Sequence, residues 1–168
     1  MSHTAAGFVP GSGAGALLVE DLESALERGA PIYAELLGGN VNSGGQRGTG
    51  SMTAPNSTAV QHCISTALKN AGIKSNEIDA INGHLTATTK DSLEIENWTK
   101  ALGLKGNDFP YINSLKSLTG HCLAAAGSVE SVAAVLQLHE GFIFGNTNCD
   151  DLHPEITALI DPAKIPLK

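Results

Sequence analysis

The sequence predicts an α/β fold, with a mixed sheet packed between helix layers and one central apolar helix. Short apolar runs alternate with helical segments along the chain, as in layered α/β proteins. The stretch from His121 to His139 is apolar nearly all round, which indicates a helix buried on most sides. A length of 168 residues, with 42% apolar and 16% charged residues, indicates one domain over residues 1–168.

The first third of the chain predicts a strand, a helix and a second strand. Residues 13–20 and 32–37 are apolar runs that we expect to be strands. Residues 21–28 between them read as a short helix that ends at Gly29. Residues 38–55 are rich in Gly, Ser, Thr and Asn and should form a long loop, which in a compact domain is usually functional or disordered.

Two amphipathic helices follow, each ended by a glycine. Asn56 or Ser57 caps the first helix, which runs to about Ala71 before Gly72. Its apolar positions share one helical face, at Val60, Ile64, Ala67, Leu68 and Ala71. The second helix covers residues 89–102 before Gly103. Its expected core contacts are Leu93, Trp98, Ala101 and Leu102.

The remaining elements complete the layered pattern. Residues 76–82 and 111–114 predict two short buried strands, and residues 158–160 predict a last one. The apolar helix over residues 121–139 needs layers on both sides. The helices of this chain are few, so we expect the chain to be part of something larger.

Composition excludes several classes of protein. The formal charge of −7 argues against a nucleic-acid partner, and an acidic carrier protein would need a local basic patch. We find no basic start followed by an apolar run that would mark a secretory signal, and polar residues interrupt the least polar stretch, which argues against a membrane span. Three irregularly spaced cysteines fit a reducing cytoplasm.

Three local patterns have a structural explanation that outweighs a functional one. The glycines of residues 11–15 precede a predicted strand rather than a helix, so tight backbone packing is favoured over phosphate binding. Cys149 and His153 could ligate a metal but lack a second close pair, so we predict no metal site. Cys122, at an expected helix start that would lower a thiol pKa, is better explained by packing.

Two histidines stand just past apolar runs. His84 follows the strand predicted over residues 76–82, and His121 follows the strand predicted over 111–114. Ligands of layered α/β proteins bind at the edge where such strands end, so two imidazoles delivered there are a plausible catalytic pair.

The surroundings of these histidines support that interpretation. Thr86 and Thr88 follow His84 at alternate positions, which would point their hydroxyls the same way. We expect His121 to begin a helix, whose dipole keeps the ring neutral and able to donate a hydrogen bond. Lys116 and Glu130 could form a buried pair that braces the site.

At these residues the sequence resembles the C-terminal half of the β-ketoacyl-acyl-carrier-protein synthases, the thiolase-like condensing enzymes of fatty-acid and polyketide synthesis. The most specific match is NSLKSLTGHCLAAAG at residues 113–127, similar to the family's NS-x-K-x-x-x-GH-x-x-x-AAG. Further similar segments are residues 7–23, 25–35, 52–55 and 140–148.

The resemblance implies a role for each site residue. His84 and His121 would be the active-site histidines, supported by Lys116 and Glu130. Thr86 and Thr88 would hold the pantetheine arm, so no cofactor is bound by the chain itself, because phosphopantetheine arrives on the acyl carrier protein. In the family a cysteine takes the acyl chain, malonyl carrier loses carbon dioxide, and the histidines stabilise the enolate that attacks the acyl thioester.

The sequence departs from the family pattern in three respects. The nucleophilic cysteine belongs to an N-terminal half that these residues do not match, and the glycine-rich segment that lines the acyl site is missing after Lys168. The family's HGT-x-T reads His84-Leu-Thr-Ala-Thr88, with Leu85 in place of glycine. The spacing from His84 to Asp91 and Glu94 is also one residue short.

Three hypotheses follow. The first is a C-terminal domain that carries the histidines but not the thiol, and that is inactive for condensation alone. The second is a split enzyme whose cysteine-bearing half is a separate polypeptide. The third is a non-catalytic partner subunit or scaffold of the same fold. Each implies a homo- or hetero-oligomer, and none involves nucleic acid or a membrane.

Overall fold

Two short parallel strands at the centre of the molecule set the position of the site. The computed structural model describes residues 1–44 and 55–167, so most of the 52–55 match lies outside the described residues. Strand β1 (Ala80–Asn82) pairs in parallel with β2 (Tyr111–Asn113), with Ile81 opposite Ile112. Both isoleucines are buried. The prediction for β1 was too long, because a 3-10 turn over Ser75–Glu77 precedes the strand.

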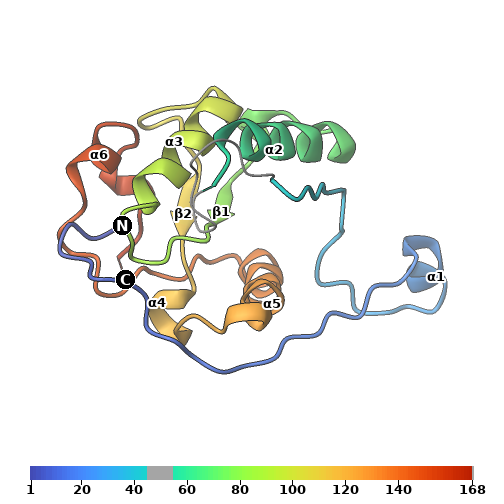
Figure 1. Cartoon of the computed structure of the whole chain (residues 1–168). Coiled ribbons are helices and arrows are strands. Elements are labelled where there is room, and N and C mark those ends of the chain that lie inside the picture. Colours follow the sequence, from blue (N-terminus) through green and yellow to red (C-terminus); the bar gives the residue numbers. More distant parts are fainter. Residues whose placement is uncertain (45–54, 168) are drawn as a thin grey trace.

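The helices lie to either side of these strands (Figure 1). Helices α2 (Ser57–Ala71) and α3 (Asp91–Leu102) pack against each other on one side. On the other side lie α4 (Lys116–Thr119) and α5 (Ala126–Glu140), and α6 (Pro154–Thr157) packs against α3. This arrangement confirms an α/β fold, although the described residues form a two-stranded parallel sheet rather than a larger mixed one.

The predicted ends of α2 and the predicted C-terminal end of α3 are confirmed, whereas α3 begins at Asp91 instead of residue 89. The Asn56 side chain accepts a hydrogen bond from the Ala59 N–H and so caps α2. The glycines that end α2 and α3, Gly72 and Gly103, adopt the left-handed conformation with φ of 69° each. Of the core contacts expected from α3, Leu102 is buried, Trp98 and Ala101 are partly buried, and Leu93 is not part of the core; the fully buried apolar residue of this helix is Ile95.

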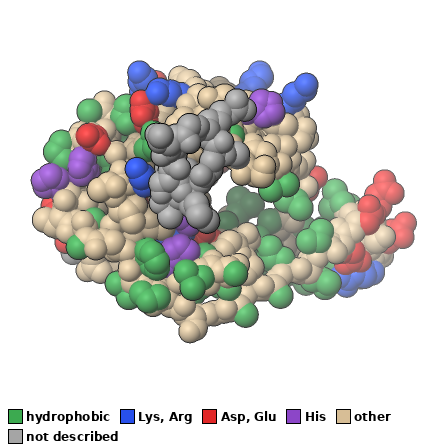
Figure 2. All heavy atoms as spheres, in the orientation of Figure 1, with side chains coloured by type: hydrophobic (Ala, Val, Ile, Leu, Met, Phe, Trp, Pro, Cys, Tyr) green, Lys and Arg blue, Asp and Glu red, His purple; other side chains and the backbone are tan. Residues whose placement is uncertain are grey.

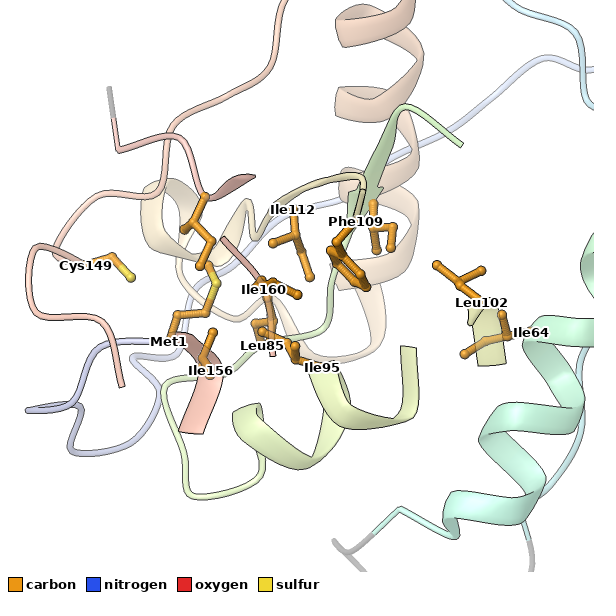
Figure 3. Packing of buried hydrophobic residues seen from close by; sticks show 12 residues of the cluster. Met1, Ile64, Leu85, Ile95, Leu102, Phe109, Ile112, Cys149, Ile156 and Ile160 are labelled. Atoms are coloured by element: carbon orange, nitrogen blue, oxygen red, sulfur yellow. The ribbon is translucent and has the colours of Figure 1, made fainter. Parts of the chain in front are cut away.

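One hydrophobic core joins β1, β2, α3 and the C-terminal segment (Figure 3). Its buried members are Met1, Ile64, Ile81, Leu85, Ile95, Leu102, Phe109, Ile112, Cys149, Ile156, Ile160 and Ile165. Most of the aliphatic members are β-branched isoleucines, which fit the close packing around short strands. The core therefore lies directly beneath the ends of β1 and β2.

Residues 8–42 form a long excursion, here called the arm, that leaves the core and returns to it (Figure 1). Helix α1 (Leu22–Glu27) lies at its far end, within the range that the sequence predicts, and the Asp21 side chain caps it. Apolar side chains along the arm are exposed, and Leu18 is 93% exposed. Figure 2 shows these side chains as hydrophobic surface along the arm.

The predictions of strands over residues 13–20 and 32–37 are wrong for this structure. Among the described residues, no backbone hydrogen bond joins either segment to a neighbouring strand. A strand needs a partner for its N–H and C=O groups, and no described strand pairs with residues 13–20 or 32–37; the bridge of Pro10 with His121 lies before the first of these segments. The strand predicted over residues 158–160 is reduced to a single parallel bridge between Ile160 and Gly106, because helical hydrogen bonds that follow α6 take up the N–H groups of this segment.

The central helix was also predicted too long and too buried. Helix α5 begins at Ala126, after a 3-10 turn over Leu123–Ala125 in which Leu123 has a φ of 50°. Only Ala126, Ala133 and Gln137 of α5 are buried, and Leu138 is 68% exposed. The described residues cover only one face of α5. The helix is therefore not central in this chain, although its composition is apolar.

We predict that Ile95→Ala lowers the free energy of unfolding by about 2–5 kcal/mol, since it removes a fully buried side chain and leaves a cavity. Urea denaturation followed by circular dichroism measures this change. The matched control is Leu18→Ala on the arm, which should change stability by less than about 0.5 kcal/mol. Equal effects of the two substitutions would contradict the core described above.

Candidate active site

His84 lies immediately beyond β1, at the edge of the sheet where both parallel strands end. The Gly83 N–H donates to the Asn113 carbonyl at 2.8 Å, which extends the pairing of β1 and β2 by one residue. The His84 N–H donates to Glu94 Oε1 on α3 at 2.6 Å. The main chain of His84 is thus fixed, while the residue itself remains exposed, although it is not among the residues that line the groove described below.

His121 follows α4, and the arm holds its main chain on both sides. The His121 N–H donates to the Val9 carbonyl at 2.8 Å, and the Gly11 N–H donates to the His121 carbonyl at 3.0 Å. Its ring is oriented by the next turn, because the Leu123 N–H donates to His121 Nδ1 at 3.0 Å. A neutral ring that accepts at Nδ1 carries its proton on Nε2. The fold therefore selects the tautomer of His121.

The two histidines meet edge to face. The ring centroids of His84 and His121 are 5.2 Å apart with an interplanar angle of 82°. On its other side His121 contacts the ring of Phe8, with centroids 4.9 Å apart. The structure thus brings together the two residues that the sequence proposed as a pair.

Partial removal from water lowers the pKa of both imidazoles. For each ring desolvation is the main cause, and the positive charge of Lys116 adds to it. Glu130 opposes the shift at both rings, as does Asp91 at His84. The direction agrees with the expectation of a neutral His121, but the cause is not a helix dipole, since α5 begins only at Ala126.

Lys116 and Glu130 form the predicted ion pair. Lys116 Nζ contacts Glu130 Oε1, and the side chains are 6% and 14% exposed. Lys116 is the first residue of α4 and Glu130 lies in α5, so the pair joins the helices on either side of His121. Removal of one partner of a nearly buried pair strongly destabilises the folded protein, because the other charge stays buried without compensation.

The glycines of residues 11–15 allow the arm to lie against α4 and α5. A Cβ on Gly11 would lie 2.4 Å from the Thr119 carbonyl oxygen, and one on Gly15 would lie 2.6 Å from the Ser128 carbonyl carbon. The interpretation of these glycines as tight packing is therefore confirmed. Gly120 meets the arm from the other side, with a φ of 71°.

A groove of about 560 Å³ runs between the start of the chain, the turn after His84, and the segment from Ser114 to His121. Thr86, Lys116 and His121 line it, together with Phe8 and Leu85. Thr88 does not line this groove; its hydroxyl lies 3.2 Å from the Thr86 hydroxyl. Of the threonines predicted to contact pantetheine, Thr86 is therefore in place to do so directly.

Two carboxylates of α3 hold the turn between His84 and Thr88. Glu94 accepts the N–H groups of His84 and Leu85, and Asp91 accepts those of Thr86, Ala87 and Thr88. Burial raises the pKa of Glu94, and the two N–H donors counteract this. Asp91 also contacts the amino group of Met1.

Sequence reasoning missed the positioning roles of Phe8, Glu94 and Asn146. Asn146 is buried, accepts the Ser114 N–H at 2.9 Å, and donates to the Ile112 carbonyl at 3.2 Å. It therefore occupies the edge of β2 that another strand would use. Its place in the family-like segment over residues 140–148 was the available signal, but nothing local says that its amide will be buried.

The cysteines do not form a second site. Cys122 is buried beside Gly13, whose added Cβ would lie 3.3 Å from the sulfur, in agreement with a packing role. Burial raises the pKa of Cys149, which disfavours its thiolate. The residues described by the structure contain no group of three or more potential metal ligands, and His153 instead caps α6.

Comparison with known proteins gives the same assignment as the residues. A family model described as "Beta-ketoacyl synthase, C-terminal domain" matches residues 33–150. The chain belongs to this family. The chloroplastic 3-oxoacyl-[acyl-carrier-protein] synthase I of Arabidopsis thaliana is 41% identical over 84% of this chain and 29% of its own length. Synthase 2 of Vibrio harveyi is 37% identical over 86% of this chain and 35% of its own length.

Solved structures with the same fold are ketosynthases. The ishigamide ketosynthase/chain length factor superposes with a TM-score of 0.81 and 32% identity, over 95% of this chain and 39% of that chain. The oxazolomycin ketosynthase domain of Streptomyces albus JA3453 gives a TM-score of 0.85 and 27% identity, over 99% of this chain and 28% of that chain. This chain thus spans roughly a third of the length of the relatives that it matches.

These coverages include the arm. An overlap of 95–99% of this chain leaves little room to omit residues 8–42, so the arm follows a course found in larger ketosynthases.

No helix in the described part of the chain has the length and apolar character needed to cross a membrane. On the face drawn in Figure 2, basic side chains are scattered rather than gathered into one patch.

We predict that both site histidines titrate below the ordinary value of 6.5, because desolvation and Lys116 disfavour their charged forms. Folding then favours the neutral rings, and this stability is present above about pH 6.5 and lost as the pH falls below it. Titration of the ring signals by NMR, assigned with His84→Gln and His121→Gln, measures the midpoints. Lys116→Met should raise both midpoints. Values at or above 6.5 in the unaltered chain would contradict this account.

Proposed function

We propose that this chain is the C-terminal part of a 3-oxoacyl-[acyl-carrier-protein] synthase and carries out the decarboxylation step of a decarboxylative Claisen condensation. The observation that carries the proposal is the contact between the imidazoles of His84 and His121, whose ring centroids are 5.2 Å apart. Both rings have a lowered pKa, and they lie beside a groove and a buried Lys116–Glu130 pair. Membership of the β-ketoacyl synthase family supports it.

The chemistry requires a place for negative charge on an oxygen. When a malonyl thioester loses carbon dioxide, the C–C bond to the carboxylate breaks and its electron pair moves into the thioester carbonyl as an enolate. Neutral imidazoles donate N–H groups to that oxygen, and they stabilise charge that is absent from the substrate, so they lower the barrier. His121 offers Nε2–H, because its Nδ1 is already occupied by the Leu123 N–H.

Condensation needs a second reactant, an acyl thioester held on a cysteine. The enolate carbon would attack the thioester carbon, and the cysteine thiolate would leave with the bonding electron pair. Cys149 lines the groove, but its raised pKa makes it a poor nucleophile. We therefore propose that the chain alone decarboxylates malonyl carrier weakly and does not condense, and that a cysteine-bearing polypeptide completes the reaction.

The groove supplies a route for the substrate. Thr86, whose hydroxyl is near that of Thr88, would hold the pantetheine arm of an acyl carrier protein at the groove. A ketosynthase in complex with an acyl-carrier protein is among the similar solved structures, at 34% identity and a TM-score of 0.73. The chain itself needs no bound cofactor in this proposal, because the pantetheine arrives with the carrier.

The arm is the surface that we propose for the cysteine-bearing polypeptide. Its two ends are held, since Gly11 bonds to His121, and Asn70 Nδ2 donates to the Gly39 carbonyl at 2.9 Å. Between these ends its apolar side chains are exposed, including Leu18 and Val19. A fixed, apolar and unpaired segment matches an interface that buries hydrophobic surface in the assembled protein.

A second candidate is a non-catalytic subunit of the same fold that pairs with a complete ketosynthase. The observation in its favour is Leu85, a branched residue with a positive φ of 26° where the family has glycine. Turnover by a reconstituted mixture decides between the two. For either candidate we propose a reducing compartment such as the cytoplasm, because Cys63, Cys122 and Cys149 are all free thiols.

We predict that His121→Ala lowers malonyl-carrier decarboxylation by about two to three orders of magnitude, by analogy with the loss of one oxyanion donor. The assay follows carbon dioxide release by the chain mixed with the part of the Vibrio harveyi synthase that this chain does not cover. The control is His62→Ala, which alters an exposed histidine of α2 and should leave the rate unchanged. An unchanged rate for His121→Ala would reduce this histidine to a packing residue.

We also predict that Leu18→Asp weakens association with that complementary part at least tenfold, because a carboxylate would be buried in an apolar interface. Analytical ultracentrifugation measures the affinity. Lys105→Asp, an exposed change outside the arm, is the control, and both variants should unfold at the temperature of the unaltered chain. Equal affinities for the two variants would exclude the arm as the docking surface.

A further inference from the structure

The turn that carries His84 contains backbone strain. Leu85 has a φ of 26° and Ala87 a φ of 59°, in the left-handed region that favours glycine. A side chain in this region is unfavourable, and such a conformation persists only where the surroundings impose it. Two such residues at positions 85 and 87 therefore imply that something compensates for them.

The side chain of Leu85 is the first compensation. It is 4% exposed and belongs to the main core, in the same cluster as Ile95, Ile156 and Ile160 (Figure 3). It also folds back against Gly83, where an added Cβ would lie 2.8 Å from Leu85 Cδ1. Gly83 is thus needed to make room for the leucine, and a glycine at position 85 would have no such anchor.

The main chain of Leu85 is tied on both sides. Its N–H donates to Glu94 Oε2 at 2.8 Å, and its carbonyl accepts a hydrogen bond from the Ser114 hydroxyl at 3.1 Å. Ser114 directly follows β2 and lies two residues before Lys116. Leu85 therefore links the His84 turn to α3 and to the segment that leads towards His121.

We propose that Leu85 is a positioning residue, whose buried side chain holds the strained turn in place and thereby keeps the His84 ring against the His121 ring. The turn in this chain is fixed by an apolar anchor in the core, in addition to the hydrogen bonds that its N–H groups donate to Asp91 and Glu94. The catalytic meaning of this arrangement rests on the proposed function, but the position of the ring does not.

The test compares four forms of the full chain: unaltered, Leu85→Ala, Ile95→Ala and Ala87→Gly. Leu85→Ala and Ile95→Ala each shorten one buried side chain of the same core, but only Leu85 belongs to the turn. Ala87→Gly relieves strain without touching the core. The readouts are the nuclear Overhauser effect between the His84 and His121 rings and the exchange rate of the Leu85 and Thr86 amides.

We expect Leu85→Ala to abolish the contact between the rings and to speed exchange of these amides about tenfold or more through local opening. Ile95→Ala should retain the ring contact, and Ala87→Gly should retain it and raise the midpoint of thermal unfolding. If Leu85→Ala does not fold, the comparison is made in the Ala87→Gly background, which adds stability. Retention of the ring contact and of amide protection in Leu85→Ala would overturn the proposal.

These readouts need no turnover. Loss of the ring contact in Leu85→Ala supports the positioning role even if the reconstituted mixture fails to release carbon dioxide. A mixture that releases carbon dioxide equally well with Leu85→Ala, while the rings stay in contact, contradicts the positioning role and leaves the proposed function intact.

Discussion

The site depends on the parallel pairing of β1 with β2. The strands are parallel, and Asn82 lies opposite Asn113. The main chain therefore leaves both strands at the same edge of the sheet. Each then turns into a segment that presents a histidine. The amide of Asn113 donates to Gln137 of α5 at 2.7 Å and to the Phe144 carbonyl, which ties this edge to the helix that follows His121. A shift of the register by one residue would exchange buried and exposed side chains and separate the rings.

The second requirement is that the rings are neutral, and several opposing charges act on them. Lys116 disfavours imidazolium, and Glu130 favours it. Since these two side chains pair with each other, their effects on the histidines partly cancel. Desolvation is left as the largest effect at each ring, and it favours the neutral form. The role that the sequence assigned to a helix dipole belongs to burial instead.

The sequence predicted the parts of the molecule that local chemistry determines. Asn56 and Gly72 mark the ends of α2, and Gly103 marks the end of α3, because caps and left-handed glycines act within a few residues. The family motif located Lys116 and His121, the wider resemblance added Glu130, and the ion pair of Lys116 with Glu130 is present as predicted. The strands predicted over residues 13–20 and 32–37 failed for a non-local reason: an apolar run becomes a strand only beside a partner, and the described residues provide none. The contact of Phe8 with His121 and the burial of Asn146 join distant segments, so no local pattern could reveal them.

The most direct test of this account is the protonation of His121 at neutral pH. Nitrogen-15 NMR of the ring distinguishes an N–H from a bare nitrogen at each position. The account predicts a neutral ring with its proton on Nε2, an unprotonated Nδ1 that accepts the Leu123 N–H, and a nuclear Overhauser effect to the His84 ring. A charged His121, a proton on Nδ1, or no effect between the two rings would contradict it.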